Sequence, residues 1–400
     1  MGRPISNEMA GPLAPFAAAY TSRLKERGYT RFTTLNAVRV MALASRWLED
    51  SGLGAGDFSS ERIEEFVQAR RASGYALACS GRSLVMVVEL LSEAGVVVPA
   101  EVVKSERSGV DVLLDSFRRY LVDERALADS TAAAHVKRAA RFLARIDGCG
   151  LEAVTAADVT AAVLAEANRV SVGSTQYFVA ALRSFLRFCF ITGVVKRDLS
   201  AAALAMTGRR QSSLPRGIAA ADAAALLASC DRRRCDGRRD YAVVVTLLRL
   251  GLRASEVAGL QLDDIDWRSG EIEVRGKGGR TDRLPLPADV GEAIAGYLQR
   301  GRPATSSRAV FQRSLAPMGA LGRGGVSCIV RRACRRAGMA EVGAHRLRHT
   351  VACEMVTAGV PLAEIGQVLR HRSLSATAIY ARVDIEQLRS VAQPWPGASR

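Results

Sequence analysis

The sequence lacks the features that mark membrane proteins and common metal sites. Its 400 residues contain no run of about 18 apolar residues, the length of a membrane span. The N-terminus has no apolar signal-peptide core. The eight cysteines form no Cys-x-x-Cys pair, and we interpret them as small side chains buried in a reducing compartment. We therefore expect a cytoplasmic protein with no membrane partner.

Histidine and lysine are scarce, and their positions are informative. Only four histidines occur, and three of them are His345, His349 and His371. His345 and His349 have the i, i+4 spacing of metal ligands. However, arginines lie between them and no glutamate of a metalloprotease motif is present, so we predict no metal ion. Of the 31 Lys and Arg residues after position 207, Lys277 is the only lysine.

The charge is strongly positive and unevenly distributed. The net charge is +16, and residues 208–400 hold 31 basic against 18 acidic residues. A surplus of this size favours a polyanionic partner such as DNA and says nothing about the fold.

The length predicts two or three domains, and an internal repeat shows where the first two lie. Residues 46–53, 58–63 and 82–97 recur, with a period near 96, at 141–151, 154–159 and 183–195. Each copy has the periodicity of four or five helices, with Ser59 and Thr155 as expected N-caps. We predict two tandem small helical domains, residues 1–105 and 108–207.

A basic linker, residues 208–217, is expected to precede a mixed α+β domain at 218–395. Helices are predicted from Ala219, Tyr241 and Ser255, and again after Ser327. Between them, residues 271–275 and 281–286 alternate with period two around a glycine-rich turn, which predicts an antiparallel hairpin with Pro285 at a sheet edge. The predicted fold class is mostly α, with one small antiparallel sheet in the last domain.

Two upstream residues have the chemistry of a phosphate site. Arg253 is expected at a helix start, where Glu256 three residues later can orient its guanidinium. Taken alone, this pattern is more typical of a surface ion pair. Lys277 lies in the predicted hairpin turn, and a lysine beside other cations can act as a proton donor, which an arginine cannot.

The C-terminal histidines complete this set. His345 and Arg348 share one helix face at i, i+3 spacing. They are followed by His371 and by Tyr380. A lone tyrosine indicates no function by itself, so the interpretation of Tyr380 depends on the residues near it. Together these residues supply cations to bind a phosphodiester, imidazoles to transfer protons and a phenol to attack the phosphorus.

These residues occur in segments that resemble the tyrosine recombinase/integrase family, which includes the Xer recombinases and phage integrases. The segments are TLLRLGLRASEVAGL at 246–260, VRGKG at 274–278, HRLRH at 345–349 and LRHRSLSATAIY at 369–380. The likeness covers residues 108 to about 390. Two departures stand out: Arg370 replaces the usual glycine before His371, and Ala376 replaces a common threonine.

The resemblance implies a site-specific DNA recombinase that needs no cofactor. Tyr380 would attack the scissile phosphorus, His345 would accept the Tyr380 proton, and Lys277 would protonate the leaving oxygen. The implied catalytic residues are Arg253, Lys277, His345, Arg348, His371 and Tyr380, with Glu256 supporting Arg253 and His349 assigned a structural role. Candidate DNA contacts are Arg209, Arg210, Arg216, Arg280 and Arg370.

The resemblance also implies double-stranded DNA as partner and a homotetramer on DNA during strand exchange. A mobile-element integrase is favoured over an Xer-type dimer resolution recombinase, because the chain carries an additional helical domain. A tyrosine-type topoisomerase and a DNA-binding accessory protein that does not cut remain as alternatives. The accessory protein would not need the full catalytic set.

Overall fold

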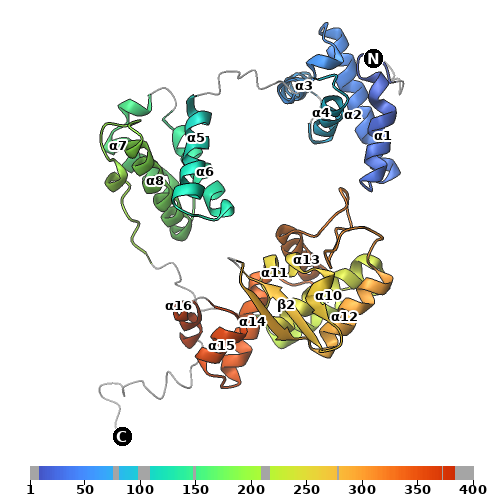
Figure 1. Ribbon diagram of the computed structural model, residues 1–400, viewed down its shortest axis with the longest axis vertical. Coiled ribbons are helices and arrows are strands. Elements are labelled where there is room, and N and C mark those ends of the chain that lie inside the picture. Colours follow the sequence, from blue (N-terminus) through green and yellow to red (C-terminus); the bar gives the residue numbers. More distant parts are fainter. Residues whose placement is uncertain are drawn as a thin grey trace. The chain divides into compact units, whose positions relative to one another are not determined.

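A computed structural model of the chain describes residues 9–74, 81–97, 109–146, 150–208, 217–276, 279–371 and 373–382. The fold is mostly helical with one small antiparallel sheet, so the expected fold class is confirmed. The chain divides into two compact units: Val98–Ser212 forms one, and Met1–Val97 with Ser213–Arg400 forms the other. Figure 1 shows the helices of these segments coloured along the sequence. None of the helices in the described ranges is long and apolar enough to cross a membrane.

The N-terminal segment folds into four α-helices with their own core. These are α1 (Ala17–Glu26), α2 (Arg31–Asp50), α3 (Ser60–Ala72) and α4 (Arg82–Glu93). Tyr20, Met41 and Leu48 lie in this core. The hydroxyl of Ser59 accepts the backbone N–H of Arg62, which confirms Ser59 as the N-cap of α3.

The second unit has as many α-helices among the described residues as the N-terminal segment. It consists of α5 (Gly109–Arg119), extended by a π-helical turn, and of α6 (Asp129–Leu143), α7 (Ala156–Ala167) and α8 (Val172–Ile191). Thr155 and Asp158 form the expected capping box at the start of α7. Thus α3 and α7, the corresponding helices of the two sequence copies, begin at equivalent caps.

The C-terminal part carries the sheet and the remaining helices. The strands β1 (Ile265–Asp266), β2 (Glu271–Arg275) and β3 (Thr281–Pro285) pair antiparallel in the order β1-β2-β3. Ile272 and Val274 of β2 point into the core, and Pro285 lies on an edge strand as predicted. The helices are α9 (Ala220–Ala228), α10 (Cys235–Leu250), α11 (Ala254–Gly259), α12 (Ala288–Arg300), α13 (Arg323–Arg336), α14 (Ala344–Thr357), α15 (Leu362–Val368) and α16 (Leu374–Ala378), followed by the 3-10 turn η7 (Ile379–Arg382).

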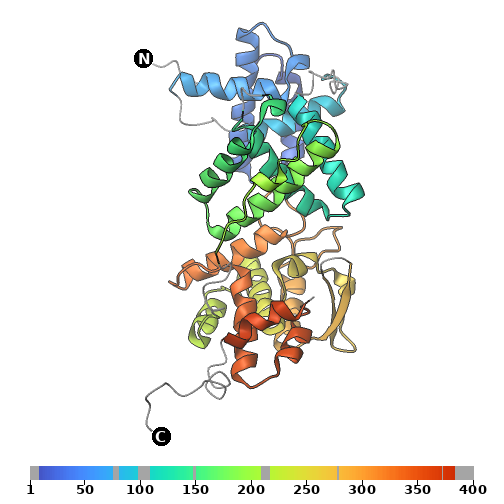
Figure 2. The same cartoon turned by 90° about the vertical axis from the view of Figure 1, so that its left-hand side faces the viewer.

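Helix α10 is the central element of this part, and its buried residues include Ala242, Val243, Val244 and Val245. Helices α12, α13 and α14 pack around it. The red C-terminal helices lie beside the yellow and orange elements in both views (Figures 1 and 2). The end of α10 is therefore held close to α14 and α15.

Two features differ from the sequence-based expectation. Helix α10 begins at Cys235 rather than at Tyr241, and strand β1 was not predicted. The first turns of α10 hold charged residues, which obscured the apolar periodicity. Two of these, Arg239 and Asp240, are buried as an ion pair, with 2.6 Å between Nη2 of Arg239 and Oδ1 of Asp240. Strand β1 has two residues, which is too short for a period-two pattern.

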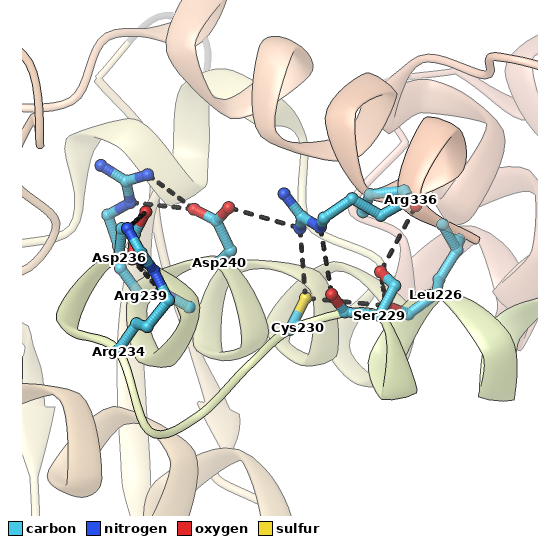
Figure 3. Close-up of polar contacts among 10 residues, drawn as sticks. Leu226, Ser229, Cys230, Arg234, Asp236, Arg239, Asp240 and Arg336 are labelled. Atoms are coloured by element: carbon cyan, nitrogen blue, oxygen red, sulfur yellow. Dashed lines mark hydrogen bonds and ion pairs between the residues drawn. The ribbon is translucent and has the colours of Figure 1, made fainter. Parts of the chain in front are cut away.

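The Arg239–Asp240 pair anchors α13 to α10 (Figure 3). Arg336 of α13 lies 3.5 Å from the second oxygen of Asp240 and donates to the carbonyl of Ser229 at the end of α9. Arg239 also donates to the carbonyl of Gln312. One buried carboxylate therefore pairs with the buried Arg239 and with Arg336, whose side chain is partly exposed.

We predict that Asp240→Asn lowers the free energy of unfolding by about 3 kcal/mol, because it leaves the buried Arg239 cation without its anion. Urea denaturation followed by circular dichroism measures the change. Asp263→Asn is the matched control, since Asp263 pairs with Arg308 at the exposed surface and should cost less than about 1 kcal/mol. Equal effects of the two substitutions would contradict the role of the buried pair.

Candidate active site

The candidate site lies where α10 ends, α11 and α14 begin, and α15 is followed by η7. Gly251 ends α10 with φ of 58°. A Cβ at this position would meet Leu369 at 2.8 Å and Val351 at 3.6 Å. Glycine is therefore required both by the backbone conformation and by the close approach of the C-terminal helices.

Arg348 is the most deeply buried cation of the site. It is 1% exposed, and its guanidinium donates to two carbonyls, that of Gly251 at 2.6 Å and that of Leu369. Burial, followed by the charge of Arg253, lowers the pKa of Arg348 to about 10. The side chain therefore stays protonated at neutral pH.

Arg253 is held by Glu256 in the way the sequence predicts. Arg253 is the N-cap of α11, and its Nη1 lies 2.5 Å from Oε1 of Glu256. The Arg253 backbone N–H donates to the other carboxylate oxygen at 2.8 Å. The Arg253 side chain is 34% exposed, whereas that of Glu256 is 2% exposed, so the arginine can still reach an incoming anion.

Glu256 also binds a second cation. Nη2 of Arg370 lies 2.9 Å from Oε2 of Glu256. Burial alone raises the pKa of Glu256, but the Arg253 N–H and the charges of Arg370 and Arg253 outweigh it, and the pKa lies below its usual value. The carboxylate is therefore ionised at neutral pH.

Tyr380 is buried against two histidines. It is 1% exposed, and its hydroxyl lies 2.7 Å from Nδ1 of His349. Its ring is parallel to that of His371, with 6.2 Å between centroids. Burial raises the pKa of Tyr380 to about 12, so the phenol is protonated at neutral pH and can donate to His349.

The two flanking histidines are neutral at physiological pH. Burial, followed by the charge of His345, lowers the pKa of His349 to about 4. Burial, followed by the charge of Arg348, lowers that of His371 to about 4. Nδ1 of His371 lies 2.7 Å from the hydroxyl of Thr377, which orients the ring.

His345 lies at the rim, on the face of α14 that also carries His349. Its side chain is exposed, and 4.4 Å separates the two ring centroids. Desolvation by the surrounding protein, followed by the charges of Arg348 and Arg253, lowers the pKa of His345. His345 is therefore the histidine of this cluster that is accessible at the edge of the site.

The structure brings together most of the residues predicted from sequence, namely Arg253, Glu256, His345, Arg348, His371 and Tyr380. Lys277 and three of the candidate DNA contacts, Arg209, Arg210 and Arg216, lie outside the described residues. Arg280 is 75% exposed beside Asp282 of β3. Arg370, in contrast, is 7% exposed and pairs with Glu256.

His349 differs most from its expected role. From the sequence, His345 is expected to accept the proton of Tyr380 and His349 to have a structural role. In the structure, His349 is the histidine that contacts the hydroxyl. The i, i+4 spacing of the two histidines places both on one helix face. That spacing could have marked His349 as a second candidate, but it could not say which ring meets the tyrosine.

Comparison with known proteins identifies the class of this fold and site. Residues 217–387 match the phage integrase family, and residues 114–191 match the phage integrase N-terminal SAM-like domain. A structure of a lambda integrase dimer bound to a core site has a TM-score of 0.54 at 17% identity, covering 72% of this chain and 99% of that one. The XerH site-specific recombinase bound to a palindromic difH substrate also has a TM-score of 0.54 at 17% identity, covering 89% and 96%. These structures share the fold.

Relatives in sequence establish the family. A putative integrase/recombinase of Sinorhizobium fredii is 40% identical over 402 residues, which cover 99% of this chain and 98% of the relative. The tyrosine recombinase XerC of Pelobacter propionicus is 32% identical over 282 residues, 69% of this chain and 92% of the relative. The chain therefore belongs to the phage integrase family of tyrosine recombinases, and the resemblance found in its sequence is confirmed. The N-terminal helices α1 to α4 lie outside both matched domains.

The histidines predict a pH dependence of stability. In the unfolded chain His349 and His371 take up protons below a pH of about 6.5, whereas in the folded chain they do so only near pH 4. Because the unfolded state then binds more protons, stability falls as pH drops from about 6.5 to 4. The midpoint of urea denaturation at pH 7.5 and pH 5 measures this loss, which should be smaller in His349→Asn. A midpoint with the same pH dependence in both proteins would contradict the prediction.

Proposed function

We propose that this recombinase cuts and rejoins double-stranded DNA through a covalent 3′-phosphotyrosine at Tyr380. One observation carries the proposal: the phenol of Tyr380 meets His349 and His371 beside the buried Arg348. The family supplies the reaction class, and the contacts among the described site residues support the roles proposed for them.

The arginines supply electrostatic stabilisation. Arg253 and Arg348 would donate to the non-bridging oxygens of the pentacoordinate phosphorus, where negative charge accumulates in the transition state. Both are already oriented, Arg253 by Glu256 and Arg348 by two helix-end carbonyls. A donor of this kind is worth roughly 3 kcal/mol, or about a hundredfold in rate. His345 and His371 would add hydrogen bonds to the phosphate.

Nucleophilic attack requires the proton of Tyr380 to leave. His349 is the better acceptor, since it is neutral and within hydrogen-bond distance of the hydroxyl, and His345 lies beside it. Tyr380 is 1% exposed in the chain without DNA, so η7 must shift before the hydroxyl can reach a phosphate. We therefore expect DNA binding and exposure of the nucleophile to be coupled.

Lys277 is proposed as the proton donor to the 5′-oxygen leaving group. The phosphotyrosine bond conserves the energy of the broken phosphodiester, so neither water nor a nucleotide cofactor enters the reaction. In the second half of the reaction, the 5′-hydroxyl of another strand attacks the phosphotyrosine and releases Tyr380. The arginines take the place that metal ions occupy in other phosphoryl-transfer sites.

Strand exchange between two duplexes requires several active sites, so we propose a homotetramer on DNA. The lambda integrase has been solved as a tetramer on a Holliday junction, which shows that this fold can be arranged in that way. We favour integration or excision of a mobile element in the cytoplasm, because a relative that this chain matches over 98% of its length is named a putative integrase/recombinase. Dimer resolution of the Xer type is the alternative, favoured by the likeness to XerC.

The nucleophile is tested with a suicide DNA substrate whose nicked strand loses the 5′-hydroxyl fragment after cleavage. The wild-type chain should form a covalent adduct that survives denaturing electrophoresis, and Tyr380→Phe should form none, because phenylalanine keeps the ring but lacks the hydroxyl. The matched control is Tyr297→Phe, which removes a buried hydroxyl that accepts the Gln312 N–H, far along the chain from the site. Adduct formation by Tyr380→Phe would refute the assignment.

Recombination and supercoil relaxation are distinguished on plasmid DNA. We expect the wild-type chain to recombine plasmids that carry two target sites and to leave a supercoiled plasmid without target sites unchanged, because strand exchange needs assembly at specific sites. Agarose gel electrophoresis resolves the products. Relaxation of the plasmid without sites, by protein that remains monomeric, would instead indicate a tyrosine-type topoisomerase.

A further inference from the structure

Arg370 occupies a backbone conformation that normally favours glycine. It lies two residues after Val368, the last residue of α15, with φ of 54°, and is one of two positive-φ residues other than glycine in the described chain. The N–H of Arg370 donates to the carbonyl of Gln367, and the N–H of His371 donates to that of Gly366. This is the Schellman pattern of a helix end, whose left-handed position is usually a glycine. A long side chain at this position costs conformational energy, which some other contact must offset.

The side chain of Arg370 turns inward, toward Glu256. It is 7% exposed, Nη2 lies 2.9 Å from Oε2 of Glu256, and Nη1 donates to the carbonyl of Val368. Nε is buried without a hydrogen-bond partner among the described residues. This burial disfavours our earlier expectation that Arg370 contacts DNA, because a phosphate would have to compete with Glu256 for the guanidinium.

Arg370 contacts Arg253 and its partner Glu256 in two ways. Its carbonyl accepts Nη2 of Arg253 at 3.3 Å, and its guanidinium shares the Glu256 carboxylate with Nη1 of Arg253. The neighbouring carbonyl of Leu369 accepts Arg348, and the next residue is His371. Residues 369–371 therefore connect three members of the site.

The charges explain why a second cation is useful there. A Glu256–Arg253 pair by itself has no net charge, and the carboxylate would hold the guanidinium against the pull of a phosphate. With Arg370 on the other carboxylate oxygen, the three side chains carry one net positive charge. Arg253 is then both oriented and still attractive to an anion.

We propose that Arg370 is a positioning residue for DNA cleavage, which holds Glu256 and the guanidinium of Arg253 in place and offsets the negative charge of the carboxylate. The inference rests on the proposed function. In this role Arg370 helps to stabilise the transition state through Glu256 and Arg253, and it does not bind DNA directly.

The test uses the full-length chain and the suicide substrate. Arg370→Gly keeps the backbone conformation and the carbonyl while removing the guanidinium, so the variant should fold. We expect the single-turnover rate of adduct formation at saturating DNA to fall roughly tenfold or more, since Arg253 is less well oriented. Affinity for uncleaved DNA, measured in a Tyr380→Phe background, and its salt dependence should be unchanged. Arg370→Lys should recover part of the rate, because it restores a cation.

The pH profile is a readout that a merely structural role would not change. Glu256 faces three cations, Arg253, Arg370 and Arg348, and it is ionised partly because of Arg370. Removing Arg370 raises the pKa of Glu256, so the acid limb of the cleavage rate should move to higher pH in Arg370→Gly. Arg370→Asn, whose side chain also tolerates the left-handed conformation, should show the same shift and serves if the glycine variant is unstable.

Two results would overturn the inference. The first is a fall in the affinity for uncleaved DNA, with the slope of log affinity against log salt concentration reduced by about one, while the rate of adduct formation at saturating DNA is unchanged. That result would show that Arg370 contacts a DNA phosphate instead. If neither rate nor pH profile changes in both neutral variants, Arg370 has no positioning role. A wild-type chain that forms no adduct dependent on Tyr380 would overturn the proposed function itself, which the Tyr380→Phe control separates from either result.

Discussion

The site depends on a buried guanidinium that no carboxylate among the described residues contacts directly. Arg348 is 1% exposed and is satisfied by carbonyls at the ends of two helices, Gly251 after α10 and Leu369 after α15. The C-terminal end of a helix carries partial negative charge, so the two helix ends together replace the missing anion. This arrangement keeps the cation free for a phosphate while preventing the cost of an unpaired buried charge. It also explains why Gly251 must lie so close to Leu369.

The other groups are arranged around that cation according to charge. Glu256 is the single carboxylate that hydrogen-bonds to the site arginines in the described part of the chain, and it orients Arg253 while Arg370 neutralises its second oxygen. The imidazoles stay neutral because they are buried beside cations, and the phenol stays protonated because it is buried beside neutral rings. The result is a site with excess positive charge and a protonated tyrosine, which favours the binding of DNA before any reaction can take place.

Much of this could be predicted from the sequence because the relevant patterns are local. Arg253 and Glu256 are three residues apart on a helix start, and the caps Ser59 and Thr155 and the β2–β3 hairpin depend on neighbours within a few residues. The start of α10 could not be predicted, since Arg239 and Asp240 are polar residues that become buried only because they pair with each other and with Arg336. Strand β1 was missed because two residues carry no pattern.

The amino-acid sequence by itself determined the family, the chemical groups of the site and the repeat of helical domains, because residue types and short spacings are sufficient for these. Tertiary structure decided how those groups are used. His349 rather than His345 meets Tyr380, and Arg370 turns away from solvent to Glu256, through contacts between residues 31 and 114 positions apart. Contacts over such separations depend on how the helices pack around α10. The linear sequence alone does not show which distant side chains will be in contact.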